Sequence, residues 1–153
     1  MTIEQRLKEM GVVLPKPSAP AANYLPFVRH GDLLFISGQV PFENGAVAVK
    51  GKLGAGVSLE DGRRAARICA INVLAQISAG LDGDLERVVR FLRVTGFVAS
   101  APDFTDQPQV INGASDFFVE VLGDAGRHSR AAVGMAALPM DAAVEVDAIV
   151  AVK

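Results

Sequence analysis

The feature of this sequence that most constrains its fold is a set of expected strands that are apolar on both faces. Leu33, Leu34, Phe35 and Ile36 follow one another without the alternation of a half-exposed strand. Residues 87–98 likewise carry valine, leucine and phenylalanine at both parities. Such continuous apolar runs are typical of strands that are buried on both faces. The fold must therefore cover both sides of a sheet.

Turn and breaker residues divide the apolar runs into five expected strands. The first two are joined by a tight turn at Gly31 and Asp32. The predicted strands span residues 27–30, 33–37, 87–98, 130–138 and 143–152. Residues 42–57 are rich in glycine and are predicted to form a long loop with a small hairpin.

Two amphipathic helices are expected between these strands. The first spans residues 58–79, with Ser58 as its N-cap and Gly80 as its terminator. The second spans residues 107–122, with Asp106 as a cap, Pro108 in its first turn and Gly123 at its end. The order β-β-α-β-α-β-β predicts an α+β single domain, with one mixed sheet and two helices on one face.

The N-terminal segment is predicted to be an attachment to this domain. Residues 2–10 suit a short amphipathic helix that ends at Gly11. Pro15, Pro17 and Pro20 then indicate an extended connection. We therefore divide the chain into an arm at residues 1–20 and a domain at residues 21–153.

Two helices can cover only one face of such a sheet, so the second face needs another cover. In the last strand, the even-numbered positions that we expect to face the helices hold Val144, Val146, Val150 and Val152. The odd-numbered positions, which face the other side of the sheet, are half apolar and hold Ala143, Glu145, Asp147, Ile149 and Ala151. The chain is 50% hydrophobic and only 21% charged. This surplus predicts that another subunit covers the second face.

Bulk composition argues against several classes of protein. The net charge is −2, whereas nucleic-acid binders usually carry a basic stripe, so a nucleic-acid partner is not expected. The densest basic group, Arg63, Arg64 and Arg67, suits a solvated helix face. Cys69 is the single cysteine, which excludes an internal disulfide and is expected to be a small core residue. No signal sequence or membrane-spanning run is apparent, so a cytoplasmic location is expected.

Common catalytic motifs are missing from the sequence. It holds no Gly-x-Gly-x-x-Gly turn, no phosphate-loop lysine motif and no Gly-x-Ser-x-Gly elbow. His30 and His128 are too few for an ordinary histidine metal site, and both are interpreted as polar loop histidines.

Two charged residues stand out against apolar neighbours. Arg130 opens the fourth strand among small residues and could bind a carboxylate through its guanidinium fork. Glu145, between two valines, could position a water or carry a proton. Alternatively, Arg130 is a strand-end arginine paired with an acidic residue, and Glu145 is a structural partner of an arginine, including Arg130 itself.

Several short segments occur in this order and spacing: residues 36–41 (Ile-Ser-Gly-Gln-Val-Pro), Asn112, residues 130–133 (Arg-Ala-Ala-Val), residues 138–139 (Leu-Pro) and residues 144–148 (Val-Glu-Val-Asp-Ala). Together they resemble the Rid/YjgF family of reactive-intermediate deaminases, also catalogued as L-PSP endoribonuclease-like proteins. The resemblance runs from about residue 21 to residue 153. It implies a chorismate-mutase-like fold and a homotrimer with ligand clefts between subunits.

The resemblance also implies a reaction and a set of site residues. The reaction is hydrolysis of a 2-imino acid, the tautomer of an enamine such as 2-aminoacrylate, to a 2-keto acid and ammonia, as in 2-iminobutanoate/2-iminopropanoate deaminases. Arg130 would bind the substrate carboxylate and Glu145 the attacking water. Cleft residues would be Ser37, Gly38, Asn112 and Ala132. Neither a metal nor an organic cofactor would be needed.

The chain departs from the family pattern at several cleft positions. Phe27 stands where deaminase-active members carry a tyrosine, and Tyr24 lies close by in sequence. Ala132 replaces a frequent cysteine, and His128 and Ser129 replace a usual Pro-Ala pair. The arm and the loop at residues 42–57 are longer than in compact members.

Three hypotheses follow. The first is an imine deaminase, because Arg130 and Glu145 stand at the positions of the family's carboxylate-binding arginine and water-binding glutamate. The second is a non-catalytic module that binds a small carboxylate metabolite, which the phenylalanine at position 27 favours. The third, a ribonuclease or translation inhibitor, is suggested only by family names and conflicts with the acidic pI of about 5.6.

Overall fold

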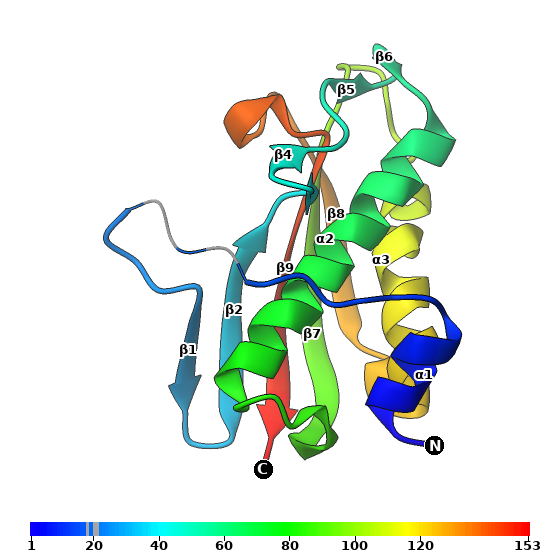
Figure 1. Cartoon of the computed structure of the whole chain (residues 1–153). Coiled ribbons are helices and arrows are strands. Elements are labelled where there is room, and N and C mark those ends of the chain that lie inside the picture. The colour runs from blue at the N-terminus through cyan, green and yellow to red at the C-terminus, as the bar shows by residue number, and fades with distance from the viewer. Residues whose placement is uncertain (18, 20–21) are drawn as a thin grey trace.

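The computed structural model describes residues 1–17, 19 and 22–153 of the chain. Its centre is a five-stranded sheet with the strand order β1-β2-β9-β7-β8 (Figure 1). The strands are β1 (Phe27–His30), β2 (Leu33–Gln39), β7 (Val88–Ala99), β8 (Ser129–Met135) and β9 (Val144–Val152). The predicted element order and α+β class are therefore confirmed.

The sheet is mixed because one pair of neighbours is parallel. β7 and β8 run parallel, while β1–β2, β2–β9 and β7–β9 pair antiparallel. The connection between β7 and β8 is a helix, as a parallel crossover requires. Gly31 has a φ of 59°, which lets it make the tight turn between β1 and β2.

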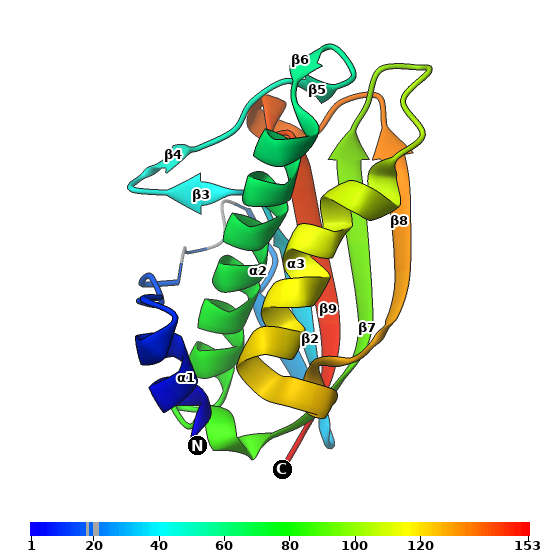
Figure 2. The ribbon, with the colours of Figure 1, turned by 90° about the vertical axis from the view of Figure 1, so that its right-hand side faces the viewer.

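Two long helices, α2 (Leu59–Gly80) and α3 (Gln107–Leu122), lie together on one face of the sheet (Figure 2). The Ser58 side chain caps α2 by accepting a hydrogen bond from the Asp61 backbone N–H at 3.1 Å. Pro108 lies in the first turn of α3, and Gly123 ends that helix with a φ of 65°. These end signals are as predicted, except that the Asp106 side chain makes no capping hydrogen bond.

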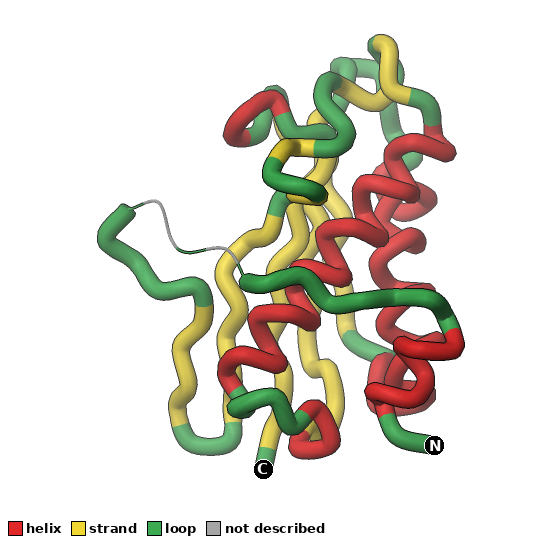
Figure 3. The backbone as a smooth tube through the Cα atoms, in the orientation of Figure 1, coloured by secondary structure: helices red, strands yellow, loops and turns green. Residues whose placement is uncertain are grey.

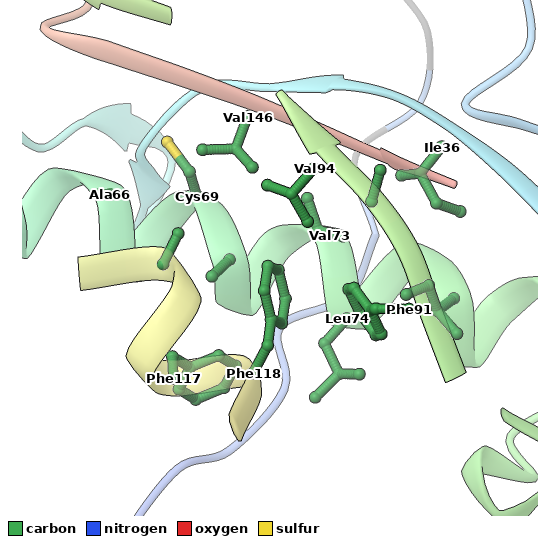
Figure 4. Close-up of a cluster of buried hydrophobic side chains, with 14 of the residues drawn as sticks. Ile36, Ala66, Cys69, Val73, Leu74, Phe91, Val94, Phe117, Phe118 and Val146 are labelled. Carbon is green, nitrogen blue, oxygen red and sulfur yellow. The ribbon is translucent and has the colours of Figure 1, made fainter. Parts of the chain in front are cut away.

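The core fills the space between these helices and the sheet (Figure 4). Phe91 of β7 and Phe118 of α3 stack with ring centroids 4.3 Å apart. Cys69 is fully buried beside β9, as expected of a small core residue, and burial raises the pKa of its thiol well above the usual range. In β9 the predicted inward valines are all buried: Val144, Val146, Val150 and Val152.

The structure corrects two predicted element ends. Gly80 does not terminate α2 but is its last helical residue, placed where the Leu34 side chain comes close to its Cα. The chain instead turns at Asp82 and Gly83, which both have positive φ. The fourth strand ends at Met135 rather than at residue 138, because η3 (Pro139–Asp141) turns the chain back toward β9.

The loop at residues 42–57 holds more order than one hairpin. β3 (Phe42–Glu43) and β4 (Ala46–Val47) form the predicted small hairpin. β5 (Lys52–Leu53) and β6 (Gly56–Val57) form a second, parallel pair that the sequence analysis did not predict.

In residues 1–17 of the N-terminal segment, the chain packs against the helical layer and contributes no strand to the sheet. α1 (Ile3–Glu9) buries Ile3 and Leu7, and a capping box at Thr2 begins it. The chain after α1 then crosses α2 as an extended segment, drawn as the dark green tube in Figure 3. Pro20 and the predicted boundary between residues 20 and 21 lie outside the described residues.

No element among the described residues covers the opposite face of the sheet. A row of registered residues crosses it from Val28 through Phe35 and Ile149, and Val28 and Phe35 are 49% and 39% exposed. Val133 lies on this face at β8, also 39% exposed. No helix among the described residues is long and apolar enough to span a bilayer.

Candidate functional site

Arg130 lies on the helix side of the edge strand β8. It is paired with Val94 of β7, which is fully buried, and both side chains share one face of the sheet. Its guanidinium reaches α3, where Nη1 donates to Asn112 Oδ1 at 2.8 Å and to Ser115 Oγ at 3.1 Å. Asn112 and Ser115 are three residues apart on α3 and therefore lie on one helix face. The predicted pair Arg130 and Asn112 is thus in direct contact.

These two bonds use one end of the guanidinium. Nη1 carries two hydrogens, and each has a protein acceptor. Within the described part of the chain, Arg130 forms no ion pair with a carboxylate. The alternative interpretation, an arginine at a strand end paired with an acidic residue, is therefore not what the structure shows. The Nε–Nη2 edge has the geometry for a bidentate carboxylate.

Ser115 in turn contacts His128, which precedes β8. Ser115 Oγ and His128 Nε2 are 2.9 Å apart, and His128 Nδ1 lies 2.6 Å from the Gly126 carbonyl oxygen. Burial lowers the pKa of His128; the nearby charge of Arg130 lowers it further, and the bond to Gly126 partly opposes the shift. His128 is a loop histidine, as predicted, but it is an ordered part of the arginine's surroundings.

Glu145 lies on the opposite face of the sheet. It is paired with Phe97 of β7 and alternates with the buried Val144 and Val146, so it points away from the helices. Its carboxyl group lies against Gly38 of β2: a Cβ on Gly38 would come within 2.9 Å of Glu145 Cδ. The predicted residues Gly38 and Glu145 therefore touch, and a glycine is needed for that approach.

A cavity of about 460 Å³ opens beside this pair. Its wall includes the predicted residues Tyr24, Ser37, Gly38 and Glu145, together with Met140. The Ser37 hydroxyl donates to the Leu25 carbonyl at 2.7 Å, which ties the segment carrying Tyr24 to β2.

The Glu145 carboxyl is half-buried and lies near a second carboxylate, that of Asp147. Burial raises its pKa, and the nearby Asp147 carboxylate raises it further. A carboxyl whose pKa is shifted toward neutrality is a better general base or acid at physiological pH. Asp147 was not among the predicted site residues, although its position two residues along the same strand signals a shared face.

Two further predicted residues lie elsewhere. Phe27 pairs with Ile36 and packs beside Gly80 of α2, so it belongs to the helix side and not to the cavity of Glu145. Tyr24 is the aromatic residue that the structure brings to that cavity. Ala132 pairs with Gly96 and lies two residues from Arg130, on the same face of β8.

The predicted site residues therefore form two separate groups in one chain. Arg130, Asn112 and Ala132 lie at the outer edge of the helix side, whereas Gly38, Tyr24 and Glu145 lie at the other face. Arg130 and Glu145 do not form an ion pair within the described residues, so Glu145 is not the structural partner of Arg130. The sequence analysis missed Ser115. Its signal was the three-residue spacing from Asn112.

Comparisons with known proteins agree with this architecture. Residues 4–151 match the model of the family described as "YjgF/chorismate mutase-like, putative endoribonuclease". The chain is 46% identical over 149 residues to Protein TCP17 of Trypanosoma cruzi, covering 97% of this chain and 92% of that protein.

Solved structures of similar fold fall into nearer and more distant relatives. The protein Atu1372 from Agrobacterium tumefaciens is 52% identical, with a TM-score of 0.94, covering 99% of this chain and 92% of that chain. E. coli TdcF, solved with bound serine, is 25% identical with a TM-score of 0.65, covering 90% of this chain and 94% of that chain. The matched family model spans nearly the whole chain, so this protein belongs to the YjgF/chorismate mutase-like family.

Proposed function

We propose that this protein hydrolyses reactive 2-imino acids, the tautomers of enamines such as 2-aminoacrylate, to 2-keto acids and ammonia. The observation that carries the proposal is the set of contacts made by the Arg130 guanidinium. Its guanidinium is held by Asn112 and Ser115, while its Nε–Nη2 edge meets no carboxylate in the described structure. An arginine fixed at one end and open at the other suits a substrate carboxylate.

Besides Arg130, the reaction needs one further protein group, a proton carrier. The carbon of a protonated imine is electrophilic, so water can attack it to give a carbinolamine. Glu145 would accept a proton of that water and pass it to the nitrogen. The carbon–nitrogen bond then breaks and ammonia leaves, while the hydroxyl gives its proton to Glu145 as the carbonyl forms. The raised pKa of Glu145 suits both steps. No metal or cofactor enters this scheme.

The proposal requires more than one copy of the chain. Arg130 and Glu145 lie on opposite faces of the sheet, so one substrate cannot touch both within one chain. The exposed apolar face carries Phe35 and Val133, which an association between copies would bury. We therefore propose a homotrimer in which Arg130 of one copy faces Glu145 of its neighbour, with a cleft at each contact.

An imine-trapping assay tests the proposal. An amino-acid oxidase generates the imine, semicarbazide traps it, and a deaminase lowers the amount trapped. We expect the wild-type protein to lower trapping and Arg130→Ala to abolish the effect. Arg130→Lys should lose most of it, because an ammonium cannot bind a carboxylate side-on at two points. Unchanged trapping with every 2-imino acid tried would refute the proposal.

A second candidate is a module that binds small carboxylates without turnover. The structure of E. coli TdcF holds serine, which shows that a relative of this fold accepts an amino acid. Thermal stabilisation by 2-keto acids together with unchanged imine trapping would favour this candidate. Endoribonuclease activity, which the family description names, gains no support from a net charge of −2.

A further inference from the structure

We propose that Ser115 and His128 are positioning residues for Arg130, which hold its guanidinium so that the Nε–Nη2 edge faces the substrate carboxylate. This inference rests on the proposed function and deepens it by assigning roles to two residues outside the predicted site. It follows from a chain of four hydrogen bonds whose directions are fixed by chemistry.

The direction of each bond follows from the Gly126 carbonyl, which can only accept. His128 Nδ1, 2.6 Å away, must therefore carry a proton. In the neutral ring Nε2 is then an acceptor, so the Ser115 hydroxyl donates to it across 2.9 Å. Once its hydrogen is committed, Ser115 Oγ offers lone pairs to Arg130 Nη1 at 3.1 Å. Asn112 Oδ1 accepts the second Nη1 hydrogen.

The imidazole is held by packing as well as by these bonds. Its centroid lies 6.0 Å from that of Phe118, with the two rings nearly perpendicular at 87°. Phe91, which stacks on Phe118, also lies near the imidazole, with centroids 6.4 Å apart. Both phenylalanines are fully buried. The orientation of His128, and through Ser115 that of Arg130, is thus tied to the rigid core.

The arrangement depends on a neutral imidazole. A protonated His128 would donate from Nε2, so the Ser115 hydroxyl would have to turn its hydrogen away. It would also set a second positive charge beside Arg130. The charged residues Arg90 and Arg127 line the same surface hollow as His128, and Arg127 pairs with the exposed Asp124 at 3.2 Å. Asp124 thus has its own partner, and the surroundings favour the neutral ring, in agreement with its lowered pKa.

Two variants separate this role from a general structural one. Ser115→Ala removes the link, and Ser129→Ala is its matched control, because the Ser129 hydroxyl donates to Leu92 instead. Isothermal titration with 2-ketobutyrate, a product-like carboxylate, measures the anion site without turnover. We expect Ser115→Ala to raise Kd about 3- to 10-fold, the range for one hydrogen bond, and Ser129→Ala to leave it unchanged.

The pH dependence of 2-ketobutyrate binding gives a second measurement, which a purely structural role of His128 would leave unchanged. We expect wild-type binding to weaken as the pH falls below the usual histidine range, since His128 then gains a proton. His128→Gln places an amide oxygen within reach of Ser115 and does not titrate. This variant should therefore bind 2-ketobutyrate with wild-type affinity and should not bind it more weakly in acid. Protonation of Glu145 would act in the opposite direction, by reducing repulsion of the ligand, and is shared by both proteins.

NMR of the imidazole nitrogens provides a test that needs no ligand. The chain has two histidines, and His30 is exposed, so the two spectra can be told apart. The expected result is an Nδ1–H tautomer for His128. An Nε2–H tautomer, an unchanged Kd in Ser115→Ala, or the same acid weakening in His128→Gln would each overturn the inference. If wild type binds no 2-keto acid, the proposed carboxylate site itself fails, which is a different result from these.

Discussion

Replacing Gly38 by alanine tests whether the Glu145 carboxyl acts from the position that the structure gives it. The new Cβ would lie 2.9 Å from Glu145 Cδ and 3.0 Å from Oε2. Gly38 does not have a positive φ, so alanine suits its backbone. The contact is with the end of a flexible side chain, which can retreat at little cost in stability.

The size of the effect follows from that contact. Ordinary van der Waals contacts begin at 3.4 Å, so the carboxyl must withdraw by about 0.5 Å. A misplacement of about 1 Å at a catalytic group can cost roughly 100-fold in rate. We therefore expect kcat for imine hydrolysis to fall about 10-fold or more, with little change in the KM set by Arg130.

The imine-trapping assay, run over a range of imine supply, measures both constants. Gly134→Ala is a matched control, because its Cβ would come equally close, 2.9 Å, to a flexible amide, Gln107 Nε2. It should keep kcat. Wild-type kcat in Gly38→Ala, or an equal loss in both variants, would refute the assignment of Glu145 as the proton carrier.

Three further predictions follow from the same structure. Gly96→Ala would drive a Cβ into the buried Ile111 side chain, so the free energy of unfolding in urea should fall by about 1–3 kcal/mol; an unchanged midpoint would contradict this packing. The raised pKa of Glu145 means that the folded state binds its proton more tightly than the unfolded state does, so this group costs stability once the pH rises through its pKa. Glu145→Gln should therefore be more stable than wild type at neutral pH, and the gain should vanish in acid below the usual carboxyl range; a gain that persists there would exclude the ionisation as its cause. Sedimentation equilibrium should give about three times the chain mass of 16.0 kDa, and a monomer at micromolar concentration would refute the trimer.

The sequence predicted the order of the main elements because their signals are local. Ser58, Gly31 and Gly123 each act within a few residues of the turn or helix end that they mark. Gly80 misled the prediction because its role is tertiary: it lies where Leu34 of another element needs room. The parallel pair β5–β6 has two residues in each strand, too few for any periodicity to appear.

The site was predictable only in part for a related reason. Arg130 and Glu145 are unusual charges in apolar strands, and the family resemblance suggested their roles. Their placement on opposite faces depends on the register of β7 with both of its neighbours, which no local pattern encodes. The link from Ser115 to His128 joins residues that lie 13 apart in sequence, and it exists because α3 packs over the start of β8.

Complementation between two inactive variants tests most directly the claim that Arg130 and Glu145 of different copies form one site. Arg130→Ala and Glu145→Gln are each expected to be inactive in imine trapping. After co-refolding in equal amounts, about a quarter of the clefts should pair an intact arginine with an intact glutamate, and about a quarter of wild-type activity should return. If both residues acted within one chain, no mixture could restore a complete site. Activity that stays absent in mixed oligomers of the right mass would contradict the account.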